Sequence, residues 1–114
     1  MKYGELIVEK KEIKILKNIM GMAHYHKDKT YKASLEKLNG ELGKARILSN
    51  KEMPEDVVRI NSIVTIELAK GIKKTYQLVT PEKSDINQNR LSLLAPMGLA
   101  LFGYAKGDEV LWQF

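Results

Sequence analysis

Apolar residues recur at helical spacing through the first part of the chain, from Ile7 onward. Two such stretches flank a polar segment, residues 24–30, which is short enough to reverse the chain. The spacing of four and three in the second stretch is typical of a two-helix coiled coil. The pattern therefore predicts an antiparallel helical hairpin, a short coiled coil. The apolar positions are Ile13, Leu16, Met20 and Ala23 in the first helix, and Tyr31, Leu35, Leu38, Leu42 and Ala45 in the second.

The period of the pattern changes to two after Pro54, a residue that disfavours helix at the position before it. Apolar and polar residues alternate over residues 58–68, which predicts one long strand. Residues 69–71 provide a turn, and residues 72–80 alternate again. The two stretches are predicted to pair as an antiparallel hairpin.

The last part of the chain combines a strand pattern with a short helix pattern. Residues 91–94 have the length and apolar character of a buried strand. Pro96 is favoured at the first position of a helix, and Gly103 is favoured just after its end. A turn at residues 106–108 then leads into a closing strand, residues 109–114.

The chain is expected to have an α+β fold. With 114 residues it has room for one ordinary domain and a small extension. We expect the helical hairpin over residues 1–50 and an antiparallel sheet domain with one short helix over residues 51–114. No apolar run is long enough to span a membrane, and the N-terminus lacks a secretory core, so a cytoplasmic location is expected.

The net charge of +5 belongs to the front of the chain. Residues 1–51 contain 12 Lys or Arg and 6 Asp or Glu, whereas residues 52–114 contain 7 and 8. This asymmetry indicates an anionic partner or a negatively charged channel. A solvated lysine-rich helix face explains it equally well. Weak, sequence-independent contact with nucleic acid is therefore the expectation for this half.

Catalytic and metal-binding motifs are scarce. The chain has no cysteine, which excludes disulfides and thiolate metal sites. His24, His26 and Asp28 alternate near the predicted hairpin tip, but a metal site needs three or four converging ligands. We expect solvent-exposed tip residues there and no metal, no cofactor and no catalytic residues.

Two series of residues carry a family resemblance. The first is Pro96-x-x-x-Ala100-Leu101-x-Gly103-x-x-x-Gly107-Asp108-x-Val110. The second runs upstream, through Glu41-Leu42-Gly43-Lys44-Ala45 and Glu52-Met53-Pro54-Glu55-Asp56-Val57-Val58-Arg59-x-Asn61-Ser62-x-Val64. In this order they resemble the bacterial Gre transcription elongation factors (GreA/GreB) and the related regulators of nucleoside diphosphate kinase (Rnk type). The resemblance covers roughly residues 35–114 and implies an FKBP-like fold for the sheet domain.

The resemblance implies binding to RNA polymerase. Gre factors insert a helical hairpin into the secondary channel, where acidic tip residues help to hold Mg²⁺ for transcript cleavage. The corresponding tip here is His24, His26, Lys27, Asp28 and Lys29, which offers one carboxylate between two lysines. Because such a Mg²⁺ site requires at least two hard oxygen ligands, we expect polymerase binding without stimulation of cleavage.

The loop before the short helix takes part in docking to polymerase in Gre-like proteins. It maps to Leu94, Ala95 and Pro96 here. The family pattern usually has a serine before the proline and, in Gre proteins, an acidic residue before that. Ala95 therefore lacks a helix-capping hydroxyl, and Leu94 lacks a charge.

The main hypothesis is therefore a monomeric, non-enzymatic transcription regulator that binds RNA polymerase near its secondary channel. One alternative is a basic nucleic-acid-binding module. Another, based on fold analogy alone, is a prolyl isomerase with a pocket built from Phe102, Tyr104 and Trp112. Core packing is the favoured role for these aromatic residues, because Trp112 and Phe114 share a strand face with Val110.

Overall fold

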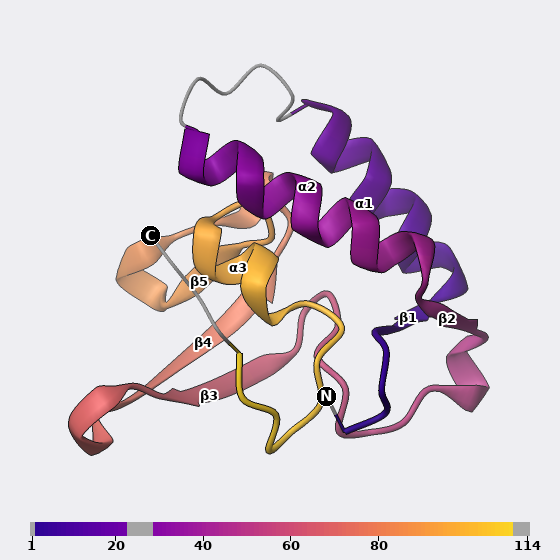
Figure 1. The fold of residues 1–114 in the computed structure, drawn as a ribbon. Coiled ribbons are helices and arrows are strands. Elements are labelled where there is room, and N and C mark those ends of the chain that lie inside the picture. Colours follow the sequence, from indigo (N-terminus) through magenta and orange to yellow (C-terminus); the bar gives the residue numbers. More distant parts are fainter. Residues whose placement is uncertain (1, 23–28, 111–114) are drawn as a thin grey trace.

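Two long helices and a small sheet enclose one short helix. The computed structural model describes residues 2–22 and 29–110. Helices α1 (Lys10–Met22) and α2 (Lys29–Gly43) lie on one side, and the three-stranded sheet lies on the other, with α3 (Pro96–Leu101) between them (Figure 1). The expected α+β class is confirmed. None of the described helices is long and apolar enough to cross a membrane.

The chain enters the fold through a buried strand, so the prediction that helix begins near Ile7 is wrong. Strand β1 (Ile7–Glu9) pairs in parallel with β2 (Arg46–Leu48). All three residues of β1 are buried. The Glu9 carboxylate then accepts hydrogen bonds from the N–H groups of Lys11, at 2.8 Å, and Glu12, at 3.0 Å. These bonds satisfy two free donors of the first helical turn, so α1 starts after Glu9.

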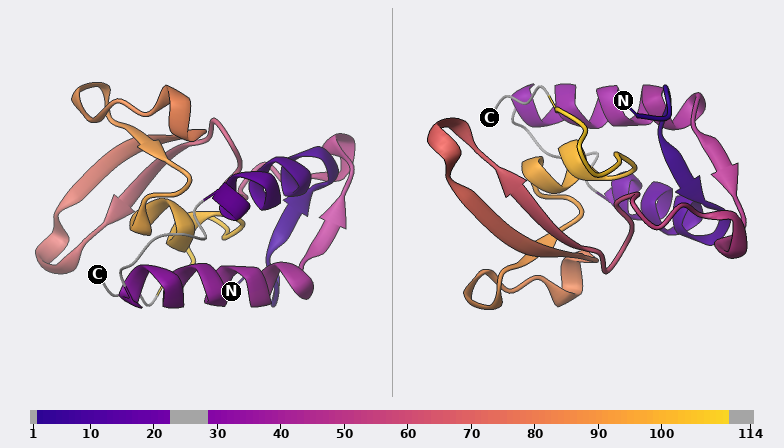
Figure 2. Two further views of the ribbon diagram at one scale, coloured as in Figure 1. Left: turned by 90° about the horizontal axis from the view of Figure 1, so that it is seen from above. Right: turned by 90° about the horizontal axis from the view of Figure 1, so that it is seen from below.

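The structure does not confirm a two-helix coiled coil. In both views of Figure 2, α1 and α2 lie apart, connected at one end through β1 and β2. Helix α2 ends at Gly43, so Ala45, which was predicted to belong to the second helix, lies outside it. The apolar faces of the two helices instead meet in a core that they share with α3 and the residues beside it. The helical spacing was thus correct, but each apolar face packs in this shared core and not against the other helix alone.

The predicted β-hairpin is confirmed, with a shorter first strand. Strands β3 (Ile63–Glu67) and β4 (Lys73–Val79) pair antiparallel across a 3₁₀ turn. Residues 58–62 do not continue β3, because Asn61 adopts a left-handed conformation with φ of 73°. The Ser62 N–H also donates to the Arg59 carbonyl, at 3.1 Å, which closes a turn before the strand.

The sheet is mixed, so the expectation of a purely antiparallel sheet is wrong. Strand β5 (Arg90–Ser92) pairs in parallel with the end of β4. Residues 80–89 contain two 3₁₀ turns, and they return the chain to the start of β5 in the same direction as β4. For the predicted closing strand, Glu109 and Val110 lie outside any strand, and residues 111–114 lie outside the described residues.

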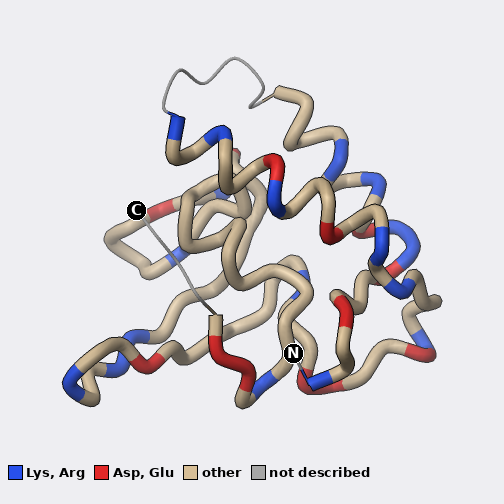
Figure 3. The backbone as a smooth tube through the Cα atoms, viewed as in Figure 1, with Lys and Arg blue, Asp and Glu red and all other residues tan. Residues whose placement is uncertain are grey.

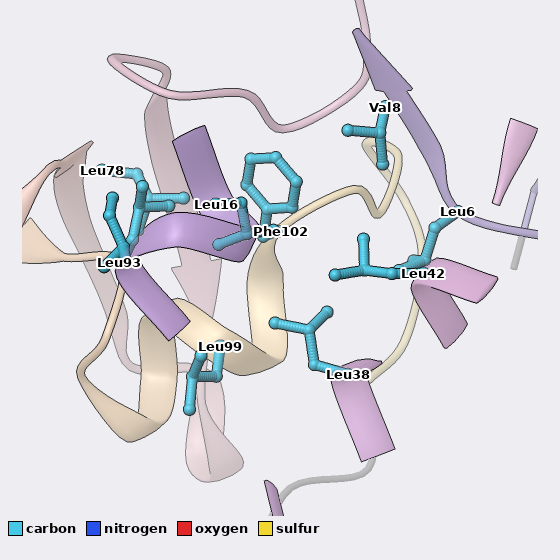
Figure 4. Packing of buried hydrophobic residues seen from close by; sticks show 10 residues of the cluster. Leu6, Val8, Leu16, Leu38, Leu42, Leu78, Leu93, Leu99 and Phe102 are labelled. Carbon is cyan, nitrogen blue, oxygen red and sulfur yellow. The ribbon is translucent and has the colours of Figure 1, made fainter. Parts of the chain in front are cut away.

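The main buried cluster draws side chains from both ends of the chain. Phe102 and Leu99 meet leucines of the two long helices and of the sheet (Figure 4). The cluster contains Leu6, Val8, Leu16, Ile19, Leu38, Leu42, Leu78, Leu93, Leu99 and Phe102. The division into residues 1–50 and 51–114 stays a prediction, and the shared cluster shows that the two parts contribute to one core.

Candidate docking site

The loop before α3 has a fixed backbone conformation. Leu93 is fully buried, and its N–H donates to the Val79 carbonyl of β4 at 2.8 Å. Ser92 then accepts two hydrogen bonds, from the Leu94 N–H to its Oγ and from the Ala95 N–H to its carbonyl, each at 3.0 Å. The predicted docking loop is thus tied to the sheet immediately before it.

Helix α2 contacts the same loop through Tyr31. The Tyr31 hydroxyl donates a hydrogen bond to the Leu94 carbonyl at 2.5 Å. Partial burial raises the pKa of Tyr31, which keeps the phenol protonated and able to donate. This contact links the helical hairpin to the loop across 63 positions of sequence.

The start of α3 lacks a side-chain cap, as the sequence indicated. Ala95 occupies the N-cap position in an extended conformation and makes no side-chain capping bond. Pro96 follows at the first helical position and is exposed. At the other end, Gly103 has φ of 82°, which confirms the predicted left-handed residue after the helix.

A groove of about 300 Å³ between α2 and α3 continues from this loop. Its apolar lining includes Leu38 and Leu99, and its charged lining includes Lys37 and Glu41. The Tyr104 hydroxyl lies 3.4 Å from Glu41 Oε2, and burial, together with the Glu41 charge, raises the pKa of Tyr104. Pro96 also lines the groove, so loop and groove form one surface.

The aromatic residues do not form an open peptide pocket among the described residues. Phe102 is only 1% exposed and belongs to the main cluster, as core packing predicted. Tyr104 is partly buried and directs its hydroxyl at Glu41. Trp112 lies outside the described residues.

The predicted hairpin tip is mostly outside the part of the chain that the structure describes. His24, His26, Lys27 and Asp28 all fall in the undescribed segment. Lys29 is the first residue of α2 and is exposed. Within residues 2–22 and 29–110, no group of three or more His, Asp or Glu side chains is arranged to hold a metal ion.

Sequence reasoning missed an ion pair that joins α1 to the segment before β3. Glu12 Oε2 accepts hydrogen bonds from Arg59 Nη2, at 2.6 Å, and Nε, at 3.0 Å. Arg59 Nη2 also donates to Asn50 Oδ1 at 3.0 Å. Glu12 is not among the apolar positions of the predicted first helix, and the only signal for this ion pair in the sequence was the position of Arg59 inside the upstream motif.

The exposed side of α1 is basic among the described residues. Lys10, Lys11, Lys14 and Lys17 are all exposed, and blue segments mark lysines along the two long helices in Figure 3. The acidic residues of this region face elsewhere, since Glu9 caps α1 and Glu12 binds Arg59. Much of the positive charge of the first half of the chain therefore lies on the exposed surface of α1 and α2.

Comparisons with known proteins agree on one family. Residues 53–114 match the family described as "Transcription elongation factor, GreA/GreB, C-term". The regulator of nucleoside diphosphate kinase from Escherichia coli (strain K12) is 42% identical over 77 residues, covering 67% of this chain and 57% of that protein. Transcription elongation factor GreA from Syntrophus aciditrophicus (strain SB) is 38% identical over 77 residues, covering 67% and 48%.

A solved structure extends the likeness over nearly the whole chain. The prokaryotic transcription elongation factor GreA/GreB from Nitrosomonas europaea superposes with a TM-score of 0.76 and 27% identity, covering 95% of this chain and 84% of that chain. The chain spans only about half the length of the two sequence relatives. The resemblance that the motifs carried is confirmed.

Proposed function

Because this chain belongs to the GreA/GreB family of transcription elongation factors, we propose that it is a regulator that binds RNA polymerase near the secondary channel without stimulating transcript cleavage. The likeness to a regulator of nucleoside diphosphate kinase supports a regulatory role. The chain is proposed to be non-enzymatic and to need no cofactor. RNA polymerase is its proposed partner.

The observation that carries the proposal is the constrained loop at residues 94–96 inside the matched region. Ser92 and Tyr31 fix its backbone from the sheet and from α2. A surface that is ordered before binding loses less conformational entropy when a partner docks. The adjoining groove adds apolar surface from Ala33, Pro96 and Ala100 for a protruding side chain of the partner.

The absence of cleavage stimulation is proposed from the sequence of the tip. Asp28 is the sole carboxylate of residues 24–30 and stands between Lys27 and Lys29. One carboxylate does not offset the dehydration of Mg²⁺, a cation that gives up its water reluctantly. The two lysines also disfavour a cation electrostatically.

The binding test uses purified bacterial RNA polymerase and a matched pair of variants on α2. Ala33 is exposed and lines the groove, whereas Asn39 is exposed and does not. We expect Ala33→Arg to weaken polymerase binding by about tenfold or more, corresponding to about 1.4 kcal/mol. Asn39→Arg adds the same charge on α2 outside the groove and should leave binding unchanged. Equal affinity for all three proteins would show that this groove is not the docking surface.

The cleavage test uses a stalled elongation complex. The protein alone should not accelerate RNA cleavage, and added beside a Gre factor it should reduce cleavage by occupying the same channel entrance. Asp28→Ala should leave this inhibition unchanged. Strong stimulation by the protein alone that disappears in Asp28→Ala would contradict the proposed role of the tip.

The exposed lysines of α1 favour nucleic-acid contact as a second candidate function. Lys10, Lys11, Lys14 and Lys17 form no ion pair with any described residue. Binding through such a face should be weak, independent of sequence and steeply reduced by salt, because it releases counterions from the nucleic acid. A salt titration with labelled duplex and single-stranded DNA tests this. Nanomolar affinity for one defined duplex at physiological salt would make nucleic acid the main partner.

Further features are proposed with the function. Residues 51–114 would be an FKBP-like domain, with residues 1–50 as the hairpin that enters the channel. The protein would act as a monomer in the bacterial cytoplasm, where RNA polymerase is found. Light scattering of the purified protein measures its oligomeric state.

A further inference from the structure

Within residues 2–22 and 29–110, strand β3 is an uncovered edge of the sheet. The strand order is β3–β4–β5, and no described strand pairs with β3 on the side away from β4. Natural edge strands are usually shielded by lysine, proline, a bulge or a covering element. The sequence of β3, Ile63-Val64-Thr65-Ile66-Glu67, contains neither lysine nor proline. Its first residue, Ile63, is 75% exposed.

The register shows which backbone groups face the free side. The Leu78 N–H donates to the Ser62 carbonyl, and the Leu68 N–H donates to the Ile72 carbonyl. Hydrogen-bonded and non-hydrogen-bonded pairs alternate in an antiparallel ladder. The N–H and C=O groups of Ile63, Thr65 and Glu67 therefore point away from β4, toward the free side.

A groove of about 1350 Å³ lies along this edge. It is lined by β3 on one side and by part of α3 with residues 104–110 on the other. The apolar side chains of Val64, Ile66 and Leu101 line it and are only half-buried. Neither buried cluster of the described residues includes a side chain of β3. The groove thus offers hydrogen-bonding backbone and uncovered apolar surface together.

The charged residues that line the groove along β3 are mainly acidic, which favours a basic binding partner. Glu55, Glu67 and Glu109 line it, are exposed and form no ion pair with a described residue. Lys106 is the single basic residue among the lining residues that the structure describes. An extended segment with apolar residues at alternate positions and lysine or arginine at its ends matches this surface.

We propose that the edge of β3 and its groove form a second binding site, which takes up a basic, extended segment of a partner polypeptide as an added strand. The site is separate from residues 94–96, and the inference does not depend on polymerase binding. The added strand pairs with the free backbone groups of Ile63, Thr65 and Glu67. Its apolar residues cover Val64 and Ile66.

The test measures fluorescence anisotropy with a labelled peptide of about nine residues, alternating valine and threonine, with a lysine at each end. We expect saturable binding. The same peptide with N-methyl groups on alternate peptide nitrogens should bind at least about tenfold more weakly. N-methylation removes the N–H groups along one edge of the peptide, which would otherwise donate to the free carbonyl groups of β3. A peptide with glutamate at each end should also bind more weakly. Equal binding of the three peptides, or no binding of the lysine peptide, would overturn the proposal.

Two variants connect the binding to β3. Thr65→Pro removes an N–H that faces the free side, a position where an edge strand tolerates proline, and should abolish peptide binding. Glu67→Lys retains the backbone and should shift the preference toward the glutamate-ended peptide. Circular dichroism verifies that each variant is folded. If Thr65→Pro does not fold, the result with Glu67→Lys decides, and an unchanged preference would reject the site.

Hydrogen exchange distinguishes other occupants of the edge. In the free protein the amides of Ile63, Thr65 and Glu67 should exchange rapidly, and the lysine peptide should protect them. Protection already present in the free monomer would mean that this chain covers its own edge. Protection that depends on protein concentration would mean that a second copy does. Either result would overturn the proposal of a partner segment.

Discussion

The carboxylate of Glu12 receives hydrogen bonds from both the guanidinium of Arg59 and the N–H of Ile60, the latter at 3.1 Å. One side chain of α1 thus holds the backbone and a side chain of the segment before β3. Both partners of the ion pair are largely shielded from solvent, with side-chain exposures of 27% for Arg59 and 13% for Glu12. Contacts of this kind contribute more than surface ion pairs, because the charged groups are desolvated and multiply hydrogen-bonded.

We expect Glu12→Ala to lower the free energy of unfolding by roughly 2 kcal/mol, because it leaves the Arg59 Nε–H and the Ile60 N–H without an acceptor. Arg59→Ala should lower the free energy of unfolding by less, because Glu12 still accepts the hydrogen bond from the Ile60 N–H. A double-mutant cycle followed by urea unfolding measures the coupling. Glu36→Ala, at an exposed position on α2, is the control and should change stability little. A coupling free energy near zero would mean that the interaction between Glu12 and Arg59 does not stabilise the fold.

Gly98 and Gly40 should respond in opposite ways to alanine. A Cβ at Gly98 would lie 2.2 Å from the Ser92 carbonyl oxygen, whereas a Cβ at Gly40 would meet nothing within 4 Å. Gly98→Ala must displace α3 or β5, and we expect a loss of several kcal/mol or no folding. Gly40→Ala should raise stability by about 0.5–1 kcal/mol. Thermal unfolding of the two variants makes the comparison, and destabilisation by Gly40→Ala would show an unseen close contact of α2.

Ala95→Ser supplies the missing cap of α3. Ala95 already has the extended conformation of an N-cap residue, so a serine hydroxyl there can accept from a free N–H of the first turn. We expect a gain of about 1 kcal/mol in the free energy of unfolding. Ala95→Gly is the control, because it changes the same position without adding an acceptor. A stability no greater than that of the parent protein would indicate that the first turn of α3 is satisfied in another way.

Tyr31→Phe removes the hydroxyl that reaches the docking loop. At neutral pH we expect a loss of about 1 kcal/mol, the usual net value of a hydrogen bond. Burial raises the pKa of Tyr31 above its usual value, so the protonated phenol stabilises the folded state fully below about pH 10, and this contribution is lost as pH rises through the folded pKa. The parent should therefore lose more stability than Tyr31→Phe between about pH 8 and pH 11. Urea midpoints measured at both values test this, and equal losses would contradict it.

Asp56 should give the protein a stability that depends on acid pH. Its carboxylate binds Lys2 Nζ and accepts from the Tyr3 hydroxyl at 2.8 Å. Hydrogen bonds from Lys2, then from Tyr3, lower the pKa of Asp56. The stabilisation is therefore present above the unfolded pKa, near 3.9, and is lost as pH falls through the folded pKa. Asp56→Asn should flatten the decline of the melting temperature below about pH 4, and Glu36→Gln should not.

Sequence periodicity alone determined those helices and strands whose signals come from residues close together in the chain. The apolar spacing gave α1 and α2, alternation gave β3 and β4, and Pro96 with Gly103 marked the ends of α3. Each of these signals reflects local geometry, in which the side-chain period or a backbone preference depends on residues a few positions apart. The ordered motifs of residues 41–45, 52–64 and 96–110 were likewise sufficient to indicate the family.

Only the tertiary structure decided which distant segments meet. Strands β1 and β5 have three residues each, too few to show a period. Strand β1 pairs with β2, which follows the two long helices in the chain, and β5 pairs with β4 across two 3₁₀ turns. The bonds from Tyr31 to Leu94 and from Arg59 to Glu12 join polar groups whose residue types alone suit an exposed surface equally well. Their burial depends on how the helices pack around Phe102, and that packing is a property of the whole core.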